Sequence, residues 1–372
     1  MFAKKASKDC YLYPDNFIAR IHMPHYDWEL SSYDYEIPES LIAQRPAPRR
    51  DKSRMLFLER HSGKISHHNF SDIVSLLPES SCLVINNTKV LPARLTGKRQ
   101  TGGKIEALLI EEKNEGYWSA IVRKAGRIKT GERLEFCGGV LRAVAKERLE
   151  EGEWLLEFEE PECLKERLEK VGLPPLPPYI KRQNASDLHN AKDRERYQTC
   201  FASKLGAIAA PTAGLHFTPE ILAKIRNRGI EILEVTLHVG LGTFSSVDEE
   251  DIRKHKMHAE FFSVSSQTLR QLQVYQNNNK QMINVGTTSV RVLETLARQN
   301  FQDSSGWTDI FIYPPCKFTM TDGLLTNFHL PKSTLMLLVS AFCGREFLLS
   351  SYQYAVAEKY RFFSYGDCML IL

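Results

Sequence analysis

The sequence predicts an α/β main domain into which an all-β domain is inserted. The α/β part is predicted by two patterns: apolar strands at Leu205–Ala210 and Ile230–Leu237 flank a helical stretch, and a strand at Gln281–Gly286 precedes a second helix. The all-β part is predicted by short alternating strands and glycine-containing turns between Leu95 and Glu160. These strands recur at about the 8 to 12 residue spacing that is typical of a small barrel or sandwich.

Length and composition agree with two domains. A chain of 372 residues is too long for one ordinary hydrophobic core. We assign 31–94 and 161–372 to the α/β domain, 95–160 to the inserted domain, and 1–30 to an extension with no assigned role. With 42% hydrophobic residues and no apolar run near the roughly 18 residues of a spanning helix, neither a disordered chain nor a membrane protein is expected. Because the first residues lack an apolar segment behind their lysines, no secretory signal is expected, and the cytoplasm is the predicted compartment.

Charge and metal-ligand spacing restrict the function less strongly. The net charge of +4 permits a nucleic-acid partner without requiring one. The eight cysteines are scattered, so no zinc knuckle or redox motif is expected. His255 and His258 lie near Glu260, but their spacing is not that of a zinc helix and no cysteine completes a ligand set. We therefore predict no metal.

Taken in order, the first part of the main domain contains a charged segment and three elements. Arg45–Arg54 is rich in arginine and proline, and is either a solvated loop or a source of phosphate contacts. A hairpin, a short helix and a buried strand follow, at Met55–Phe70, Ser71–Leu77 and Cys82–Ile85. Asn86 and Asn87 come directly after that strand. Their amides either form a turn or bind the edge of a heterocycle.

The return from the inserted domain begins with a predicted helix at Pro161–Gly172. Lys181–Tyr197 is so highly charged that we expect a mobile surface segment or a lid-like loop. The further predicted elements of the main domain are strands at Thr308–Tyr313 and Leu324–Leu330 and a buried helix at Ser333–Phe342.

Two glycine-containing runs carry the strongest candidate functional residues. Pro211–Phe217 (PTAGLHF) contains Thr212, Gly214 and His216, and Thr236–Phe244 (TLHVGLGTF) contains His238, Gly240 and Gly242. A helix lies between them, with a predicted Thr218 cap, Pro219 in the first turn and a closing Gly229. At the edge of regular structure, glycine lets a ligand approach the backbone and imidazole exchanges protons near neutral pH. The alternative is that these are turn glycines and core histidines.

A second kind of site is predicted at Thr287, Thr288 and Ser289. They follow a strand and a glycine and begin the helix Thr287–Leu296, which we expect to be capped by a hydroxyl. The free N–H groups of such a helix start bind a carboxylate or a phosphate. The run lacks the glycines and lysine of a nucleotide-binding loop.

The C-terminal segment ends in an aromatic turn that contains a cation. Arg361 is followed by Phe362, Phe363 and Tyr365. These side chains either stack on bases or pack the C-terminus against the core.

Taken together, seven long runs resemble one family, the S-adenosylmethionine:tRNA ribosyltransferase-isomerases of queuosine biosynthesis. The runs, in chain order, are NNTKVLPARL (Asn86–Leu95), AAPTAGLHF (Ala209–Phe217), TLHVGLGTF (Thr236–Phe244), HKMHAE (His255–Glu260), VGTTSVRVLE (Val285–Glu294), TNFHLPKSTLMLLVSAF (Thr326–Phe342) and EKYRFFSYGD (Glu358–Asp367). The sequence departs from the family pattern at Leu205, at Ser245 and Ser246, and at Tyr313–Cys316. These departures concern loop geometry more than the candidate catalytic groups.

The resemblance implies both a reaction and an architecture. The ribosyl part of S-adenosylmethionine would be transferred to 7-aminomethyl-7-deazaguanine at the tRNA wobble position, giving epoxyqueuosine and releasing adenine and methionine. S-adenosylmethionine would be a co-substrate, with no resident cofactor. The inserted domain would be a six-stranded antiparallel β-barrel. We expect a monomer.

The reaction suggests roles for the candidate residues. The positive sulfur acidifies the neighbouring methylene, so a histidine within hydrogen-bond reach can act as base, and a second imidazole can assist loss of adenine. His216 and His238 are the first candidates, followed by His258 and His329, and the assignment of base and acid stays open. The remaining predicted contacts are Thr287, Thr288 and Ser289 for the methionine carboxylate, Asn86 and Asn87, or Asn327, for the modified base, and Arg94, Arg291 and Arg361 for phosphate or carboxylate.

Two other classes of protein remain open at this point. One is a tRNA-binding or RNA-chaperone-like module whose histidines are structural. The other is a different S-adenosylmethionine-dependent enzyme, such as a methyltransferase, which would release S-adenosylhomocysteine instead of adenine.

Overall fold

The structure is a computed structural model that describes residues 28–123, 128–149, 152–182, 187–240 and 247–372. The chain forms two compact units. Apart from the gaps just given, the first contains residues 28–87, 211–237 and 247–372, and the second contains residues 88–210 and 238–240. The described residues of 88–94 and 161–210, which the sequence analysis assigns to the α/β domain, thus group with the barrel. Of the predicted extension 1–30, residues 1–27 lie outside the described residues.

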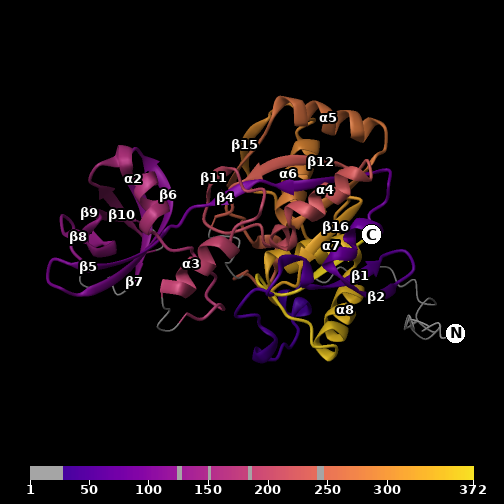
Figure 1. Ribbon diagram of the computed structural model, residues 1–372, viewed down its shortest axis with the longest axis horizontal. Coiled ribbons are helices and arrows are strands. Elements are labelled where there is room, and N and C mark those ends of the chain that lie inside the picture. Colours follow the sequence, from indigo (N-terminus) through magenta and orange to yellow (C-terminus); the bar gives the residue numbers. More distant parts are fainter. Residues whose placement is uncertain (1–27, 124–127, 150–151, 183–186, 241–246) are drawn as a thin grey trace. The chain divides into compact units, whose positions relative to one another are not determined.

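The first unit is built on a nine-stranded sheet (Figure 1). In spatial order its strands are β15 (Ser305–Thr308), β13 (Glu260–Val264), β12 (Glu231–Leu237), β3 (Ser81–Asn86), β14 (Gln281–Val285), β16 (Gly323–Asn327), β17 (Cys368–Ile371), β1 (Arg54–Glu59) and β2 (Lys64–Asn69). The four central strands β12, β3, β14 and β16 are parallel, so their carboxyl ends meet at one edge of the sheet. The indigo strand β1 pairs in parallel with the yellow strand β17, so the first and the last strand of the unit are neighbours.

Helices cover this sheet. They are α1 (Ile73–Leu76), α4 (Pro219–Asn227), α5 (Ser266–Asn277), α6 (Gly286–Arg298), α7 (Thr334–Cys343) and α8 (Arg345–Ala357). The first eleven residues of α6, from Gly286 to Leu296, are buried, and this helix packs on all four central strands. Its apolar side chains form a core with those of α5, β3 and β12, including Val84, Val235 and Leu293.

The second unit contains a closed six-stranded antiparallel barrel (Figure 1). Around the barrel the strands are β10 (Trp154–Phe158), β7 (Tyr117–Arg123), β6 (Lys104–Asn114), β5 (Arg94–Arg99), β8 (Arg133–Phe136) and β9 (Leu141–Arg148). The unit also contains α2 (Pro161–Val171), α3 (Asp187–Arg196) and a parallel pair of strands, β4 (Thr88–Val90) and β11 (Lys204–Ala207). The predicted fold class, an α/β domain with an inserted six-stranded barrel, is confirmed.

Two of the local predictions are wrong. The charged stretch Lys181–Tyr197 contains helix α3, whose Asp193 forms an ion pair with Arg182. The strand predicted at Thr308–Tyr313 ends at Thr308, where β15 stops pairing with β13. Within the described residues, no single helix is long and apolar enough to cross a membrane; α7 and α8 meet the criteria only together, with a bend of 112° between them.

Helix α4 confirms the predicted signals for its start and end. Thr218 adopts extended backbone angles and its Oγ1 accepts a hydrogen bond from the Ile221 N–H, Pro219 is the first helical residue, and Gly229 follows with φ of 78°. Thr218→Ala removes the cap, so we expect it to lower the free energy of unfolding by about 1 kcal/mol. Thr218→Ser keeps an acceptor and should cost much less. Urea unfolding measures both, and equal losses for the two variants would argue against the cap.

Candidate active site

The carboxyl edge of the central strands gathers several predicted site residues of the first unit. Asn86 ends β3, Gly286 and the residues that follow it begin α6 at the end of β14, and Asn327 ends β16. The 3₁₀ turn Thr212–His216 packs beside β16 and α6. Since open α/β sheets bind ligands outside the carboxyl ends of their strands, this edge is where a small ligand is expected.

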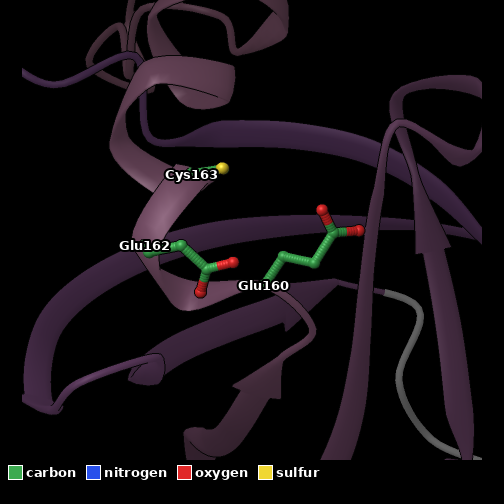
Figure 2. Close-up of side chains that lie close together, drawn as sticks. All are labelled: Glu160, Glu162 and Cys163. Carbon is green, nitrogen blue, oxygen red and sulfur yellow. The ribbon is translucent and has the colours of Figure 1, made fainter.

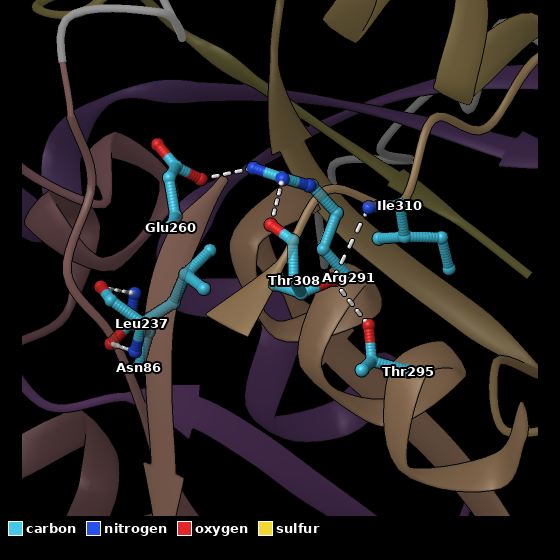
Figure 3. Close-up of polar contacts among 7 residues, drawn as sticks. All are labelled: Asn86, Leu237, Glu260, Arg291, Thr295, Thr308 and Ile310. Carbon is cyan, nitrogen blue, oxygen red and sulfur yellow. Dashed lines mark hydrogen bonds and ion pairs between the residues drawn. The ribbon is translucent and has the colours of Figure 1, made fainter. Parts of the chain in front are cut away.

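The paired asparagines serve the fold at this edge. Asn86 Nδ2 donates to the Leu237 carbonyl at 3.1 Å, and Asn86 Oδ1 accepts from the Leu237 N–H at 3.1 Å (Figure 3). Asn87 Nδ2 donates to Glu234 at 2.9 Å, and its Oδ1 accepts from Thr236 Oγ1 at 2.7 Å. Both amides thus continue the pairing of β3 with β12 beyond the last ladder bond. The prediction that they bind the modified base is not supported by this geometry.

The side chain of Arg291 is likewise bound to other groups of the protein. Figure 3 shows its guanidinium between the carboxylate of Glu260, with which it forms an ion pair, and the Thr308 carbonyl, to which Nη2 donates at 3.2 Å. Arg291 and Glu260 are 3% and 4% exposed. A buried arginine that is paired with a carboxylate is not available to a phosphate, because drawing it away would remove the positive charge that balances the buried Glu260. Arg291 is therefore better explained as a structural link between α6, β13 and β15.

His216 lies within a buried polar cluster. Its Nδ1 is 2.6 Å from Ser53 Oγ, its Nε2 is 3.3 Å from Asn327 Nδ2, and its ring lies on Phe70 with the ring centroids 5.3 Å apart. Since Ser53 Oγ donates its proton to the Arg50 carbonyl at 3.1 Å, it accepts from Nδ1–H, and this assigns the lone pair to Nε2. Burial lowers the pKa of His216 to about 3, and the charges of Arg50 and Arg361 add to the effect. His216 is therefore neutral and enclosed.

The two second-choice histidines differ sharply from each other. His329 is buried, its Nε2 lies 2.7 Å from Thr326 Oγ1, and burial lowers its pKa to about 3. His258 is exposed on the segment before β13. His329 fits a core histidine, and His258 lacks the enclosure that would set a proton-transfer group apart from water.

The two buried histidines predict an acid-sensitive fold. His216 and His329 have pKa values of about 3 in the folded protein and ordinary values near 6.5 when unfolded, so the unfolded chain binds more protons between those pH values. Their stabilisation is complete above pH 6.5 and falls toward pH 3, by about 1.4 kcal/mol per pH unit for each histidine. Urea unfolding of the wild type and of His329→Gln between pH 7 and 4.5 measures this. The free energy of unfolding of His329→Gln should fall less steeply as the pH drops, by about 1.4 kcal/mol per pH unit, because one buried histidine no longer titrates. Identical slopes for the two proteins would contradict the assignment.

His238 has the environment of a working imidazole in the second unit. It is half-buried, one residue beyond β12, and its Nδ1 lies 2.8 Å from Thr88 Oγ1. Thr88 Oγ1 also lies 3.5 Å from the Lys204 carbonyl, so the hydroxyl can donate there while it accepts from Nδ1–H, and that tautomer places the lone pair on Nε2. Partial burial lowers the pKa of His238, which keeps the ring neutral near pH 7.

The ring of His238 is also held by the backbone of β11. A Cβ placed on Gly206 would lie 2.8 Å from Nδ1, Cε1 and Nε2 of that ring, so the glycine permits the contact. The neighbouring Val239 carbonyl accepts hydrogen bonds from the Ile208 and Ala209 N–H groups, at 2.9 and 3.3 Å. The position of His238 is thus held by a hydrogen bond at Nδ1, by the close approach of Gly206 to its ring and by the hydrogen bonds of the neighbouring backbone.

The remaining predicted residues are distributed over both units. In the first unit Thr212 is half-buried and Gly214 buried, and Arg361 donates from its side chain to the Arg45 carbonyl. Phe362, Phe363 and Tyr365 are buried, which makes the stacking interpretation wrong and the packing interpretation correct. In the second unit Arg94 begins β5 and Gly240 is half-buried. Gly242 lies outside the described residues.

No metal-ligand group occurs at His255, His258 and Glu260 among the described residues. The group with metal-ligand spacing in the described part of the chain lies elsewhere, at the start of α2, and consists of Glu160, Glu162 and Cys163 (Figure 2). Glu160 is exposed and forms an ion pair with Arg167. This is the pattern of a solvated helix start rather than of a metal centre.

Three residues that contact His216 or His238 were not predicted as site residues: Ser53, Thr88 and Gly206. Ser53 lies in the charged segment Arg45–Arg54, and Thr88 directly follows the two asparagines. Both positions could have been found from the sequence, because one lies within and the other directly follows a segment that the sequence analysis singles out. Gly206 carries no sequence signal, because a single glycine near a strand has many explanations.

These features define a class of protein. A mixed sheet with four parallel central strands and a helix start at their carboxyl edge, a closed β-barrel in a separate unit and a half-exposed histidine are the features of an enzyme rather than of a purely structural module. The chain belongs to the queuosine biosynthesis protein family, whose model matches residues 30–371.

Curated relatives match over nearly their whole length. The S-adenosylmethionine:tRNA ribosyltransferase-isomerases of Acetivibrio thermocellus and Thermosipho africanus are 47% and 48% identical, and each match covers 92% of this chain and 99% of the relative. The crystal structure of an S-adenosylmethionine tRNA ribosyltransferase from Thermotoga maritima matches with a TM-score of 0.51 and 36% identity, covering 92% of this chain and all of the other. The predicted family is confirmed.

Proposed function

We propose that this protein is an S-adenosylmethionine-dependent tRNA ribosyltransferase-isomerase. It transfers and isomerises the ribosyl part of S-adenosylmethionine onto 7-aminomethyl-7-deazaguanine at the tRNA wobble position, and adenine and methionine leave. The observation that carries this choice of reaction is the full-length likeness to relatives of that name.

His238 is the proposed base. The reaction begins with removal of a proton from the methylene next to the sulfonium, and this requires a neutral acceptor that substrate can reach. His238 is half-exposed, has a lowered pKa and carries its lone pair on Nε2 while Thr88 holds Nδ1–H. His216 is enclosed and its Nε2 faces an amide donor, so the geometry favours His238 over His216 for this role.

The partners and the state of the protein follow from this function. We propose tRNA and S-adenosylmethionine as the two substrates, no resident cofactor or metal, a monomer, and the cytoplasm as the compartment where tRNA is met. Full activity in the presence of a chelator and a monomer mass by light scattering are the expected results. A chelator-sensitive activity would contradict the absence of a metal.

The reaction is tested with S-adenosylmethionine labelled in its ribosyl group and a tRNA that carries 7-aminomethyl-7-deazaguanine. We expect adenine and methionine in equal amounts and one label per modified tRNA. Release of S-adenosylhomocysteine would instead indicate a methyltransferase. Binding of tRNA without any adenine release would indicate a binding module, and either result would overturn the proposal.

A further inference from the structure

Among the described residues, no side chain caps the amino end of α6. Helices α4, α5 and α7 each begin with a hydroxyl side chain that accepts from a backbone N–H of the first turn, whereas α6 follows Val285 and has neither a side-chain cap nor an acidic residue in its first turn. The first N–H groups of any helix find no partner within the helix. At α6 the residues that carry them are buried, so bulk water is a poor substitute.

Thr288 provides a second, independent observation at the same place. It is 7% exposed, and its Oγ1 is buried without a hydrogen-bond partner in the described part of the chain. This oxygen lies 3.3 Å from the position that a Cβ on Gly286 would occupy, so it faces the residue that begins the helix. The adjacent Ser289 differs, because its Oγ donates to the Val285 carbonyl at 2.8 Å. The predicted hydroxyl cap is therefore wrong, and one hydroxyl is left for another partner.

Small groups surround this helix start. Gly286 has φ of 83°, a conformation that disfavours any side chain, and the nearest other carbon to its would-be Cβ is Ala213 Cβ at 3.7 Å. Ala213 belongs to the same turn as Thr212 and His216. The helix start therefore lies at the carboxyl edge of the sheet, beside the turn Thr212–His216.

We propose that this helix start is an oxyanion site for the α-carboxylate of the methionyl part of S-adenosylmethionine, an inference that rests on the proposed function. A carboxylate only accepts hydrogen bonds, and the site offers backbone N–H donors, one hydroxyl donor and the positive end of a thirteen-residue helix. A tRNA phosphate offers similar oxygens. The burial of Thr287 and Thr288 favours the carboxylate of a small ligand, because a phosphate in a polynucleotide keeps much of its contact with water.

The test compares binding of S-adenosylmethionine and of its decarboxylated analogue by isothermal titration calorimetry. We expect the wild type to bind S-adenosylmethionine at least about tenfold more tightly than the analogue, as for loss of a charge-assisted hydrogen bond. Thr288→Val keeps the side-chain shape and should weaken S-adenosylmethionine binding about tenfold without changing the affinity for the analogue. Ser340→Ala is the matched control: it removes another buried hydroxyl that has no hydrogen-bond partner among the described residues, on α7, and should keep the wild-type preference. Because the Thr288 hydroxyl has no partner among the described residues, Thr288→Val should not lower the urea midpoint.

The outcomes separate this site from the reaction itself. A wild type that binds both ligands equally overturns the carboxylate site and leaves the proposed function standing. A Thr288→Val variant that loses both ligands in parallel indicates a structural role and also overturns the site. Weakened tRNA binding with unchanged S-adenosylmethionine binding would assign the site to a phosphate. A wild type that binds neither ligand would overturn the proposed function.

Discussion

Replacing His238 by glutamine is expected to lower kcat by about 10³-fold, within the range for loss of a general acid–base group. Glutamine can still accept a hydrogen bond but cannot hold a proton taken from carbon, so the KM for S-adenosylmethionine should change little. Adenine release under saturating substrates measures the effect. The control is His61→Gln, because His61 is exposed in the turn between β1 and β2. A His238→Gln variant with more than a tenth of the wild-type kcat would exclude His238 as the base.

The pH dependence gives a second measurement of the same role. A base must be neutral, so activity falls as the pH drops through the pKa of His238 and is level above it. Partial burial places this pKa below the ordinary 6.5. We expect the acid limb of kcat/KM below pH 6.5 in the wild type and its loss in the residual activity of His238→Gln. An unchanged limb in the variant would assign the titration to another group.

Local sequence signals predicted the elements whose stability is decided by neighbouring residues. Thr218, Pro219 and Gly229 bound α4 because caps and turns act over a few residues. The barrel strands were recognisable because alternate side chains fill one interior, as Ile105, Ala107 and Leu109 do in β6. Local patterns of this kind can be recognised in the sequence without knowing how the rest of the chain folds.

The roles of individual polar residues were harder to predict, because their hydrogen-bond and ion-pair partners lie far away in the sequence. Asn86 binds Leu237, which is 151 residues away, and Arg291 pairs with Glu260, which is 31 residues away. Four histidines that looked alike in the sequence differ in burial: His216 and His329 are enclosed, His238 is half-buried and His258 is exposed. Desolvation lowers the pKa values of His216, His238 and His329, and burial is a property of the assembled fold.

Gly206→Ala is expected to lower kcat by about 10²-fold, although Gly206 has no group that takes part in chemistry. The added Cβ would lie 2.8 Å from three atoms of the His238 ring, which is too close for any carbon contact. The ring has to move by a substantial fraction of an ångström, and this weakens its 2.8 Å hydrogen bond to Thr88 and redirects Nε2. Misplacement of a catalytic group by about 1 Å costs on the order of 10²-fold in rate. Gly103→Ala is the matched control, since its nearest atom would be at an ordinary 3.6 Å.

The double variant decides whether Gly206 acts through His238 or through the fold. If the alanine harms catalysis only by displacing the imidazole, adding Gly206→Ala to His238→Gln should cost almost nothing more, because residues that act as a unit are strongly non-additive. A further 10²-fold loss in the double variant would mean that the alanine disturbs β11 itself or another substrate contact. Thr88→Val gives an independent arm: it removes the acceptor for Nδ1–H without adding bulk, so it should reduce kcat in the wild type and have no effect once His238 is glutamine. If Gly206→Ala and Thr88→Val both lose their effect in the His238→Gln background, the orientation of the His238 ring limits the rate. The two contacts that set this orientation are the hydrogen bond from Nδ1 to Thr88 and the packing of the ring against Gly206.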